Sequence, residues 1–166
     1  MIYTINNLLG RMGAGTRNLA WLLFRTTVAA MFATHGYDKL FGENPQRFQA
    51  SGMTTINIEN LVSFPMPLDI NALYLAGCIE LIVGALIIIG PWTHIAALIA
   101  ILEMLMAYLI MHLAWFPTLN GGELASLYFF AFLIMFCVGP GEISLDNFFE
   151  LRRQEKQKKK IEDAGF

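Results

Sequence analysis

Three ionisable residues stand inside long apolar runs of this sequence. Glu80 lies near the middle of residues 73–90, Glu103 lies near the middle of the next apolar run, and Arg25 lies about a third of the way along the first. A charged side chain at the centre of a bilayer costs roughly 2.5–3.5 kcal/mol on insertion scales, so it is retained either for a buried partner or for a function. Proton-coupled redox chemistry and transport are the functions that such groups serve.

These three side chains are expected to meet in the protein interior. Gly77 and Gly84 flank Glu80 at helical spacing, and Glu103 lies on a similar stripe of alanines, a pattern that lets membrane helices pack closely. One guanidinium and two carboxylates cannot all be charged in a site of low dielectric constant without a net negative charge. One carboxylate is therefore expected to hold a proton near neutral pH. The alternative is an arginine–glutamate clamp that only fixes helix packing.

A second set of polar residues lies at predicted helix ends on one side of the membrane: His35, Lys39, His112 and Glu123. We interpret this set as a site for a quinone headgroup or a partner protein. Helix capping, with the lysine reaching up to the interface, is the plainer alternative. The two histidines also suggest a metal or a haem, but His112 follows Glu103 by nine residues, which is about half a turn off in an ideal helix. No haem or metal is predicted.

The composition is that of one membrane domain, residues 1–166. The chain is 56% hydrophobic and 14% charged, with a mean hydropathy of +0.53, which leaves too little polar surface for a soluble globule of this size. Four spans are predicted, at about residues 18–40, 70–89, 93–114 and 122–138, with glycine and proline ending the second and fourth. Cys78 and Cys137 lie on different spans, so neither a disulfide framework nor a CxxC redox motif is expected.

The positions of the charges predict an orientation. Eight of the 11 lysines and arginines lie before residue 18 or after residue 151, so both termini are expected in the cytoplasm. The connection 42–69 then faces the periplasm. After the fourth span, Ser144 is expected to cap an amphipathic interfacial segment within the cytoplasmic basic tail, residues 142–166. Beside such a segment the tail is interpreted as contacting anionic lipid headgroups, not nucleic acid. The predicted fold class is thus an all-α integral membrane four-helix bundle.

Several short motifs occur in order between residues 25 and 146. They are Arg25, His35-Gly36-x-x-Lys39-Leu40-Phe41-Gly42, Gly77-x-x-Glu80-x-x-x-Gly84, His112, Asn120-Gly121-x-Glu123 and Gly139-Pro140-Gly141-x-x-Ser144-Leu145-Asp146. Each motif is weak alone, but their order along one chain resembles the DoxX family of small four-span bacterial membrane proteins. The polar positions that match are Arg25, His35, Lys39, Glu80, His112, Glu123 and Asp146. Glu103 and the Pro91-Trp92 turn are not part of the family pattern.

The resemblance implies an inner-membrane subunit of a quinone-linked oxidoreductase, such as a terminal quinol oxidase or a thiosulfate:quinone oxidoreductase. Because Glu80 lies in a family motif, it is the expected partner of Arg25, and Glu103 is the expected proton holder. The chain has no haem, flavin or CxxC motif, so electrons are expected from a partner protein and the isolated chain is not expected to be an enzyme. The alternative is a non-catalytic structural or assembly subunit docked on a larger membrane complex. A carrier or channel is disfavoured, since no span interior carries a helix break.

Overall fold

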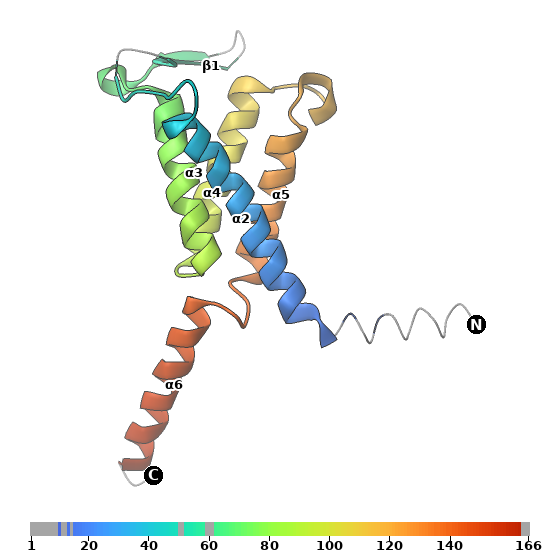
Figure 1. Cartoon of the computed structure of the whole chain (residues 1–166), viewed down its shortest axis with the longest axis vertical. Helices are drawn as coiled ribbons and strands as arrows, with labels where there is room; N and C mark the ends of the chain where they lie inside the picture. The colour runs from blue at the N-terminus through green and yellow to red at the C-terminus, as the bar shows by residue number, and fades with distance from the viewer. Residues whose placement is uncertain (1–9, 11–12, 14, 50–51, 59–61, 164–166) are drawn as a thin grey trace, which may run out of the picture.

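The structure, a computed structural model, describes residues 10, 13, 15–49, 52–58 and 62–163. Its elements in chain order are α2 (Arg17–Phe41), the strands β1 (Thr55–Ile58) and β2 (Val62–Pro65), the 3-10 turn η1 (Pro67–Asp69), α3 (Ala72–Ile89), α4 (Thr93–Met111), the 3-10 turn η2 (Pro117–Asn120), α5 (Glu123–Val138) and α6 (Leu145–Asp163). Figure 1 shows α2 to α5 standing together, with the strands at one end and α6 leaving the other. These are called the hairpin end and the α6 end.

The four predicted apolar segments are confirmed as helices. α2 and α5 match the predicted limits to within one residue, α3 begins two residues later, and α4 ends three residues earlier. By length and apolarity, α3 and α4 are candidate membrane spans, while α5 is a shorter apolar helix. α4 ends early because the backbone of His112 leaves the helical conformation, and the Tyr108 hydroxyl then donates to the carbonyl oxygen of Ala114.

The four helices enclose one apolar core. α2 packs on α3, α3 on α4 and α4 on α5, and α2 also touches α5. The fully buried core side chains come from all four helices and include Ala29, Phe32, Ile87, Ala97, Phe132 and Met135. α2 and α3 approach closely because glycine lines their contact: a Cβ added to Gly36 would lie 2.6 Å from the carbonyl oxygen of Gly77. Lys39 on α2 and Glu80 on α3, which are described below, lie along this close contact of the two helices.

The connection between α2 and α3 contains a small sheet, so the all-α prediction is wrong at this point. β1 and β2 form an antiparallel hairpin in which Thr55 faces Pro65 and Ile58 faces Val62. β1 packs against α4 and buries Ile56. The connection therefore folds back over the hairpin end of the bundle (Figure 1).

A buried asparagine fastens this connection to α3. The Asn71 side-chain oxygen accepts hydrogen bonds from the backbone N–H groups of Leu73 and Met53, and its amide nitrogen donates to the side-chain oxygen of Gln46. The first of these bonds caps the N-terminus of α3. One fully buried side chain thus fixes both the start of the helix and the path of the loop.

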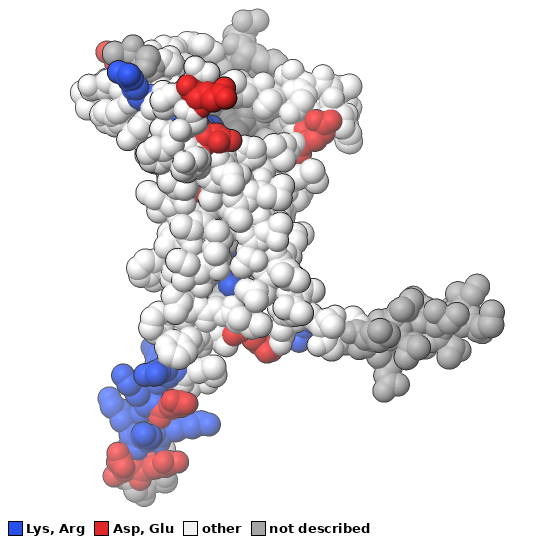
Figure 2. Space-filling model, viewed as in Figure 1, with Lys and Arg blue, Asp and Glu red and all other residues white. Residues whose placement is uncertain are grey.

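The expected interfacial segment after the fourth apolar helix takes another course. Ser144 does act as a cap, because its Oγ accepts from the backbone N–H of Asn147 at 3.2 Å. α6, however, runs away from the bundle instead of lying across its end, and it buries none of its residues (Figure 1). Figure 2 shows charged side chains gathered on α6 and at the hairpin end, with the surface between them largely free of charge.

Candidate functional site

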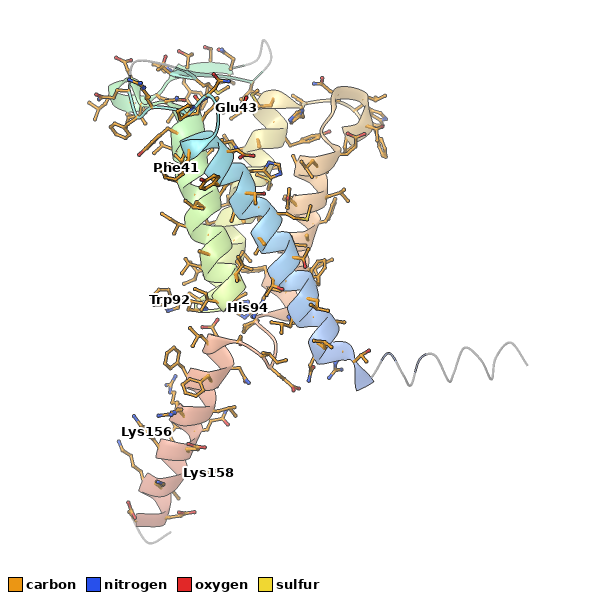
Figure 3. All side chains as sticks on the ribbon, viewed as in Figure 1. Phe41, Glu43, Trp92, His94, Lys156 and Lys158 are labelled. Atoms are coloured by element: carbon orange, nitrogen blue, oxygen red, sulfur yellow. The ribbon has the colours of Figure 1, made fainter. Side chains whose placement is uncertain are left out.

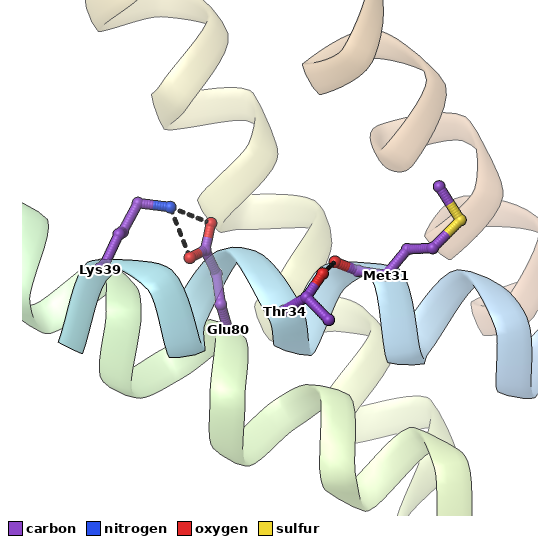
Figure 4. A network of polar contacts seen from close by, with 4 residues as sticks. All are labelled: Met31, Thr34, Lys39 and Glu80. Atoms are coloured by element: carbon purple, nitrogen blue, oxygen red, sulfur yellow. Dashed lines mark hydrogen bonds and ion pairs between the residues drawn. The ribbon is translucent and has the colours of Figure 1, made fainter. Parts of the chain in front are cut away.

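A partly buried ion pair joins α2 to α3 in the hairpin half of the bundle. The Lys39 ammonium nitrogen lies 2.6 Å and 2.5 Å from the two carboxylate oxygens of Glu80 (Figure 4). The Glu80 side chain is 5% exposed and that of Lys39 is 29% exposed. An ion pair in such surroundings is screened far less by water and salt than one on a protein surface.

The antiparallel packing of α2 against α3 brings this pair together. The space that a side chain at Gly36 would need is filled by Gly77 and Glu80, and the corresponding space at Gly77 is filled by Lys39 and Leu40. Lys39 therefore lies about one helical turn from the level of Glu80 and reaches it along the helix contact. The glycines that allow this contact are those of the two motifs in which Lys39 and Glu80 occur.

Glu103 lies at the same level on the neighbouring helix. α3 and α4 are joined by a short turn, and Glu80 stands ten residues before Gly90 while Glu103 stands eleven residues after Trp92. Both carboxyl oxygens of Glu103 are buried and have no hydrogen-bond partner among the described residues. Glu80 and Lys39 are its charged neighbours. Burying an ionised carboxylate without a partner is costly, so the neutral acid is the form that this environment favours.

α5 completes the arrangement with Tyr128. This residue is 6% exposed, and its hydroxyl is buried without a hydrogen-bond partner in the described part of the chain. The ring of His35 meets the ring of Tyr128 edge-on at 5.8 Å between centroids, and both side chains lie within electrostatic range of Glu80. We call His35, Lys39, Glu80, Glu103 and Tyr128 the interior cluster. All four bundle helices contribute to it.

The expected pairing of Arg25 with Glu80 is wrong. Arg25 precedes Lys39 by 14 residues on α2, which is about 21 Å along a helix, so it lies near the other end of the bundle. Its guanidinium donates hydrogen bonds to the carbonyl oxygens of Pro140, at 2.5 Å, and Ile143, at 2.9 Å. Arg25 therefore clamps the turn between α5 and α6, and the interior cluster does not include it.

Asp146 lies in the first turn of α6, directly after this connection, and has a structural role there. Its two carboxylate oxygens accept hydrogen bonds from the backbone N–H groups of Trp92, at 2.8 Å, and Thr93, at 2.9 Å. These are the first donors of α4, where a negative charge is favourable. The backbone N–H of Asp146 also donates to the Gly90 carbonyl oxygen. Trp92 and His94 mark this end of the bundle, opposite Phe41 and Glu43, in Figure 3.

The four residues predicted to share a rim site divide into two pairs. His35 and Lys39 belong to the interior cluster. His112 and Glu123 lie at the turn between α4 and α5, where the His112 Nδ1 atom is 2.9 Å from the Asn120 carbonyl oxygen and Glu123 is exposed. No hydrogen bond, ion pair or ring contact within the described ranges joins the two pairs. His112 thus stabilises the turn between α4 and α5, which agrees with the alternative that these residues cap helix ends.

Tyr128 and Asn71 are the polar residues that sequence reasoning missed. A tyrosine in an apolar helix is common, so nothing in its immediate sequence distinguishes Tyr128. The level of α5 against α4 is fixed by the 2.8 Å contact of the His94 Nδ1 atom with the Phe136 carbonyl oxygen. Counting nine residues from His94 reaches Glu103, and counting eight back from Phe136 reaches Tyr128. Helix register, not a motif, is the signal that finds this residue.

The interior cluster combines several kinds of polar group in a mostly apolar space. Lys39 donates hydrogen bonds and Glu80 accepts them, and the Glu103 carboxyl and Tyr128 hydroxyl have bonding capacity that no described side chain uses. Such a set can bind a small molecule that has both donors and acceptors. It can also hold a proton and pass it on, since a carboxyl, an ammonium and an imidazole lie together.

The chain thus combines two helices that are candidate membrane spans with a partly buried ion pair between its helices. Residues 20–113 match the model of the DoxX family, so the chain belongs to this family of membrane proteins, which is associated with oxidoreductase-related roles. Its location is the bacterial inner membrane. The chain is 41% identical over 130 residues to an uncharacterised protein of Haemophilus influenzae, a match that covers 75% of this chain and 87% of the relative. No solved structure matches.

Proposed function

We propose that this chain is a subunit of a quinone-linked membrane oxidoreductase and that the interior cluster handles the quinone headgroup and its protons. The observation that carries the proposal is the unpaired Glu103 carboxyl and Tyr128 hydroxyl beside the Lys39–Glu80 ion pair. Buried polar groups are nearly always hydrogen-bonded, and exceptions cluster where a protein binds or reacts. Intramembrane ionisable residues are likewise functional by default.

The residues of the cluster fit a quinone chemically. A quinone headgroup is a flat apolar ring whose carbonyl oxygens accept hydrogen bonds and whose reduced form donates them from hydroxyls. The Lys39 ammonium and the Tyr128 hydroxyl are donors for the first form, and Glu80 is an acceptor for the second. A bound quinone supplies two-electron, two-proton redox chemistry. The residues of this chain bind it, orient it and hold protons at the Glu80 and Glu103 carboxyls.

An apolar groove beside the cluster supports the same proposal. A cavity of about 220 Å³ lies between α4 and α5 and is lined by Met104, Tyr108, Ala125, Phe129 and neighbouring residues. It is smaller than a typical site for a whole drug-sized ligand, which is about 300–1,000 Å³. A segment of an isoprenoid chain needs only apolar walls, and these residues provide them. Met104, which lines this groove, belongs to the same buried core as Tyr128.

We further infer that α2 to α5 all cross the bilayer, with both chain ends in the cytoplasm. The 19 residues of α4 span about 28 Å, close to the roughly 30 Å of bilayer hydrocarbon. Trp92 precedes α4, Trp115 follows it, and both are well exposed, as residues of interfacial aromatic belts are. The cations of α6 then lie in the cytoplasm, where anionic lipid headgroups are available to them.

The test is to isolate the chain with its native lipids and partners and to measure quinone content and quinone turnover. The native chain should retain quinone in roughly stoichiometric amount. Glu80→Gln should lower the content several-fold together with turnover, whereas Glu43→Gln, an exposed carboxylate at the same end, should change neither. Absence of quinone from the native preparation, with turnover unaffected by Glu80→Gln, would exclude the proposal.

A structural or assembly subunit is the second candidate. The observation that favours it is α6, which projects from the bundle, buries none of its residues and exposes Phe148 and Phe149. Such a helix suits docking on a larger complex. Turnover of a copurifying complex that survives both Arg25→Gln and Glu80→Gln would favour this candidate over a quinone site. Recovery of the chain as a homo-oligomer without partners would count against it.

A further inference from the structure

We propose that Glu103 exchanges its proton with water at the hairpin end alone, through the position occupied by Lys39 and Glu80. The inference deepens the proposed function, because it assigns a side of the membrane to proton exchange at the same cluster. It does not depend on the identity of the bound molecule, however, and it holds for the protein with no quinone bound. The argument rests on burial and on the level of each residue in the bundle.

Lys39, Glu80 and Glu103 form a set of polar groups that is partly exposed at Lys39, near the hairpin end. The Lys39 side chain is 29% exposed, the Glu80 side chain is 5% exposed, and the two carboxyl oxygens of Glu103 are fully buried. These three residues are electrostatic neighbours and lie on three successive helices. Lys39, two residues before the end of α2, is therefore the member of this set nearest the hairpin end, and the Glu103 carboxyl oxygens are shielded although that residue as a whole is partly exposed.

The other direction is closed by packed side chains. Toward the α6 end the core consists of fully buried apolar residues from all four helices, among them Ala29, Phe32, Ile87, Ala97, Phe132 and Met135. Close-packed cores of this kind leave few voids that hold water. Beyond that layer, Arg25 and Asp146 hold the α5–α6 turn against the bundle. Protons at Glu103 thus have an exit on one side.

The groups that face Glu103 determine what happens when the proton leaves. Its charged neighbours are Lys39 from α2 and Glu80 from α3, while His35 from α2 and Tyr128 from α5 lie near Glu80, and β1 brings no titratable side chain. A proton released from the Glu103 carboxyl passes to water beside Lys39, and the carboxylate left behind is stabilised by the Lys39 ammonium. Glu80 opposes a second negative charge beside it.

Dicyclohexylcarbodiimide provides a test, because this apolar reagent reacts with protonated carboxyls in apolar surroundings and leaves a stable adduct. The native chain is labelled in sealed membrane vesicles, with the pH of the two compartments set independently, and the adduct on Glu103 is measured by mass spectrometry. Labelling of Glu43→Cys by an impermeant maleimide identifies the compartment that contains the hairpin end. Glu103→Gln should abolish the adduct, and Glu43→Gln should leave it unchanged.

The expected result is labelling of Glu103 that falls, by up to roughly tenfold per pH unit, as the hairpin-side compartment is made alkaline. Alkalinising the α6-side compartment should have no effect. Labelling that follows the α6-side pH, labelling that follows both sides, or no labelling of Glu103 at any pH would overturn the inference. A chain that shows one-sided labelling but binds no quinone would retain the inference and lose the proposed function.

Discussion

At the scale of single residues, the Lys39–Glu80 pair is expected to contribute strongly to the stability of the folded protein. Glu80 is nearly fully buried, and Lys39 is its hydrogen-bonding partner on both oxygens. Removing one partner of a buried pair leaves the other charge without compensation, whereas removing both can be close to neutral. Substituting one member of the pair should therefore destabilise the protein more than substituting both.

This gives a stability prediction for a double-mutant cycle. Lys39→Met should lower the free energy of unfolding in detergent by roughly 1–3 kcal/mol or more, because it leaves the Glu80 carboxylate unpaired. Adding Glu80→Gln should restore part of that loss, with a coupling of about 0.5–3 kcal/mol. Denaturant unfolding followed by fluorescence measures both values, with Glu43→Gln as the control. Additive losses in the double variant would mean that the two side chains do not interact.

The identities of most cluster residues were predictable, but their pairing was not. Charge within an apolar run singled out Glu80 and Glu103, whereas position at a predicted helix end singled out His35 and Lys39, which were assigned to a separate rim site. The predicted pairing of Glu80 with Arg25 is wrong because the depth of each residue in the membrane was inferred only from its position along its own span. Two antiparallel helices that are in contact at Gly36 and Gly77 must place Glu80 near Lys39 and leave Arg25 near Gly90. The partner of Glu80 is determined by the register of α2 against α3, and this register is known only from the three-dimensional structure.

At the scale of elements, the α2–α3 contact depends on the absence of a side chain at Gly36. A Cβ there would lie 2.6 Å from both the Gly77 carbonyl oxygen and the Leu81 backbone nitrogen. Gly36→Ala must therefore separate the two helices and should cost about 1–3 kcal/mol of stability. Gly15→Ala is the matched control, since nothing lies within 4 Å of that position. Equal unfolding midpoints for the two variants would show that the helices tolerate the added methyl group.

The turn between α5 and α6 offers a second prediction at this scale. Asp146→Asn keeps one acceptor oxygen but places an amide nitrogen opposite the second backbone donor of α4, and it removes a charge from the helix N-terminus. A loss of about 1–2 kcal/mol is expected from lost capping and charge. Thermal unfolding compares it with Asp163→Asn, an exposed aspartate at the far end of α6. A loss no larger than that of the control would contradict the capping role.

The helices were predictable because their apolar runs are long and end at glycine, proline or a helix cap. The β1–β2 hairpin was not, because the connection 42–69 has no Asn-Gly or Asp-Gly pair between alternating strands and its apolar residues are scattered. Its strands form where β1 can pack on α4 and bury Ile56. The direction of α6 is likewise set by contacts of the α5–α6 turn with residues distant in the sequence. No local sequence pattern predicts these contacts.

At the scale of the whole molecule, the two ends differ in charge and in structure. The start of α2 and the whole of α6 lie at one end, and the hairpin lies at the other (Figure 1). Lysine and arginine side chains collect on α6 (Figure 2). In membrane proteins such an excess marks the cytoplasmic side, because the orientation that retains lysine and arginine there is favoured during insertion. We therefore expect the hairpin and the entrance to the interior cluster to face the periplasm.

Cysteine labelling in intact cells checks this orientation. Cys78 and Cys137 are first replaced by alanine, and single cysteines are then introduced at the exposed positions Glu43 and Arg153. An impermeant maleimide added outside should label Glu43→Cys once the outer membrane is opened. It should reach Arg153→Cys only after the inner membrane is permeabilised, because α6 is expected in the cytoplasm. Labelling of Arg153→Cys from outside would reverse the orientation and direct proton exchange at Glu103 to the cytoplasm.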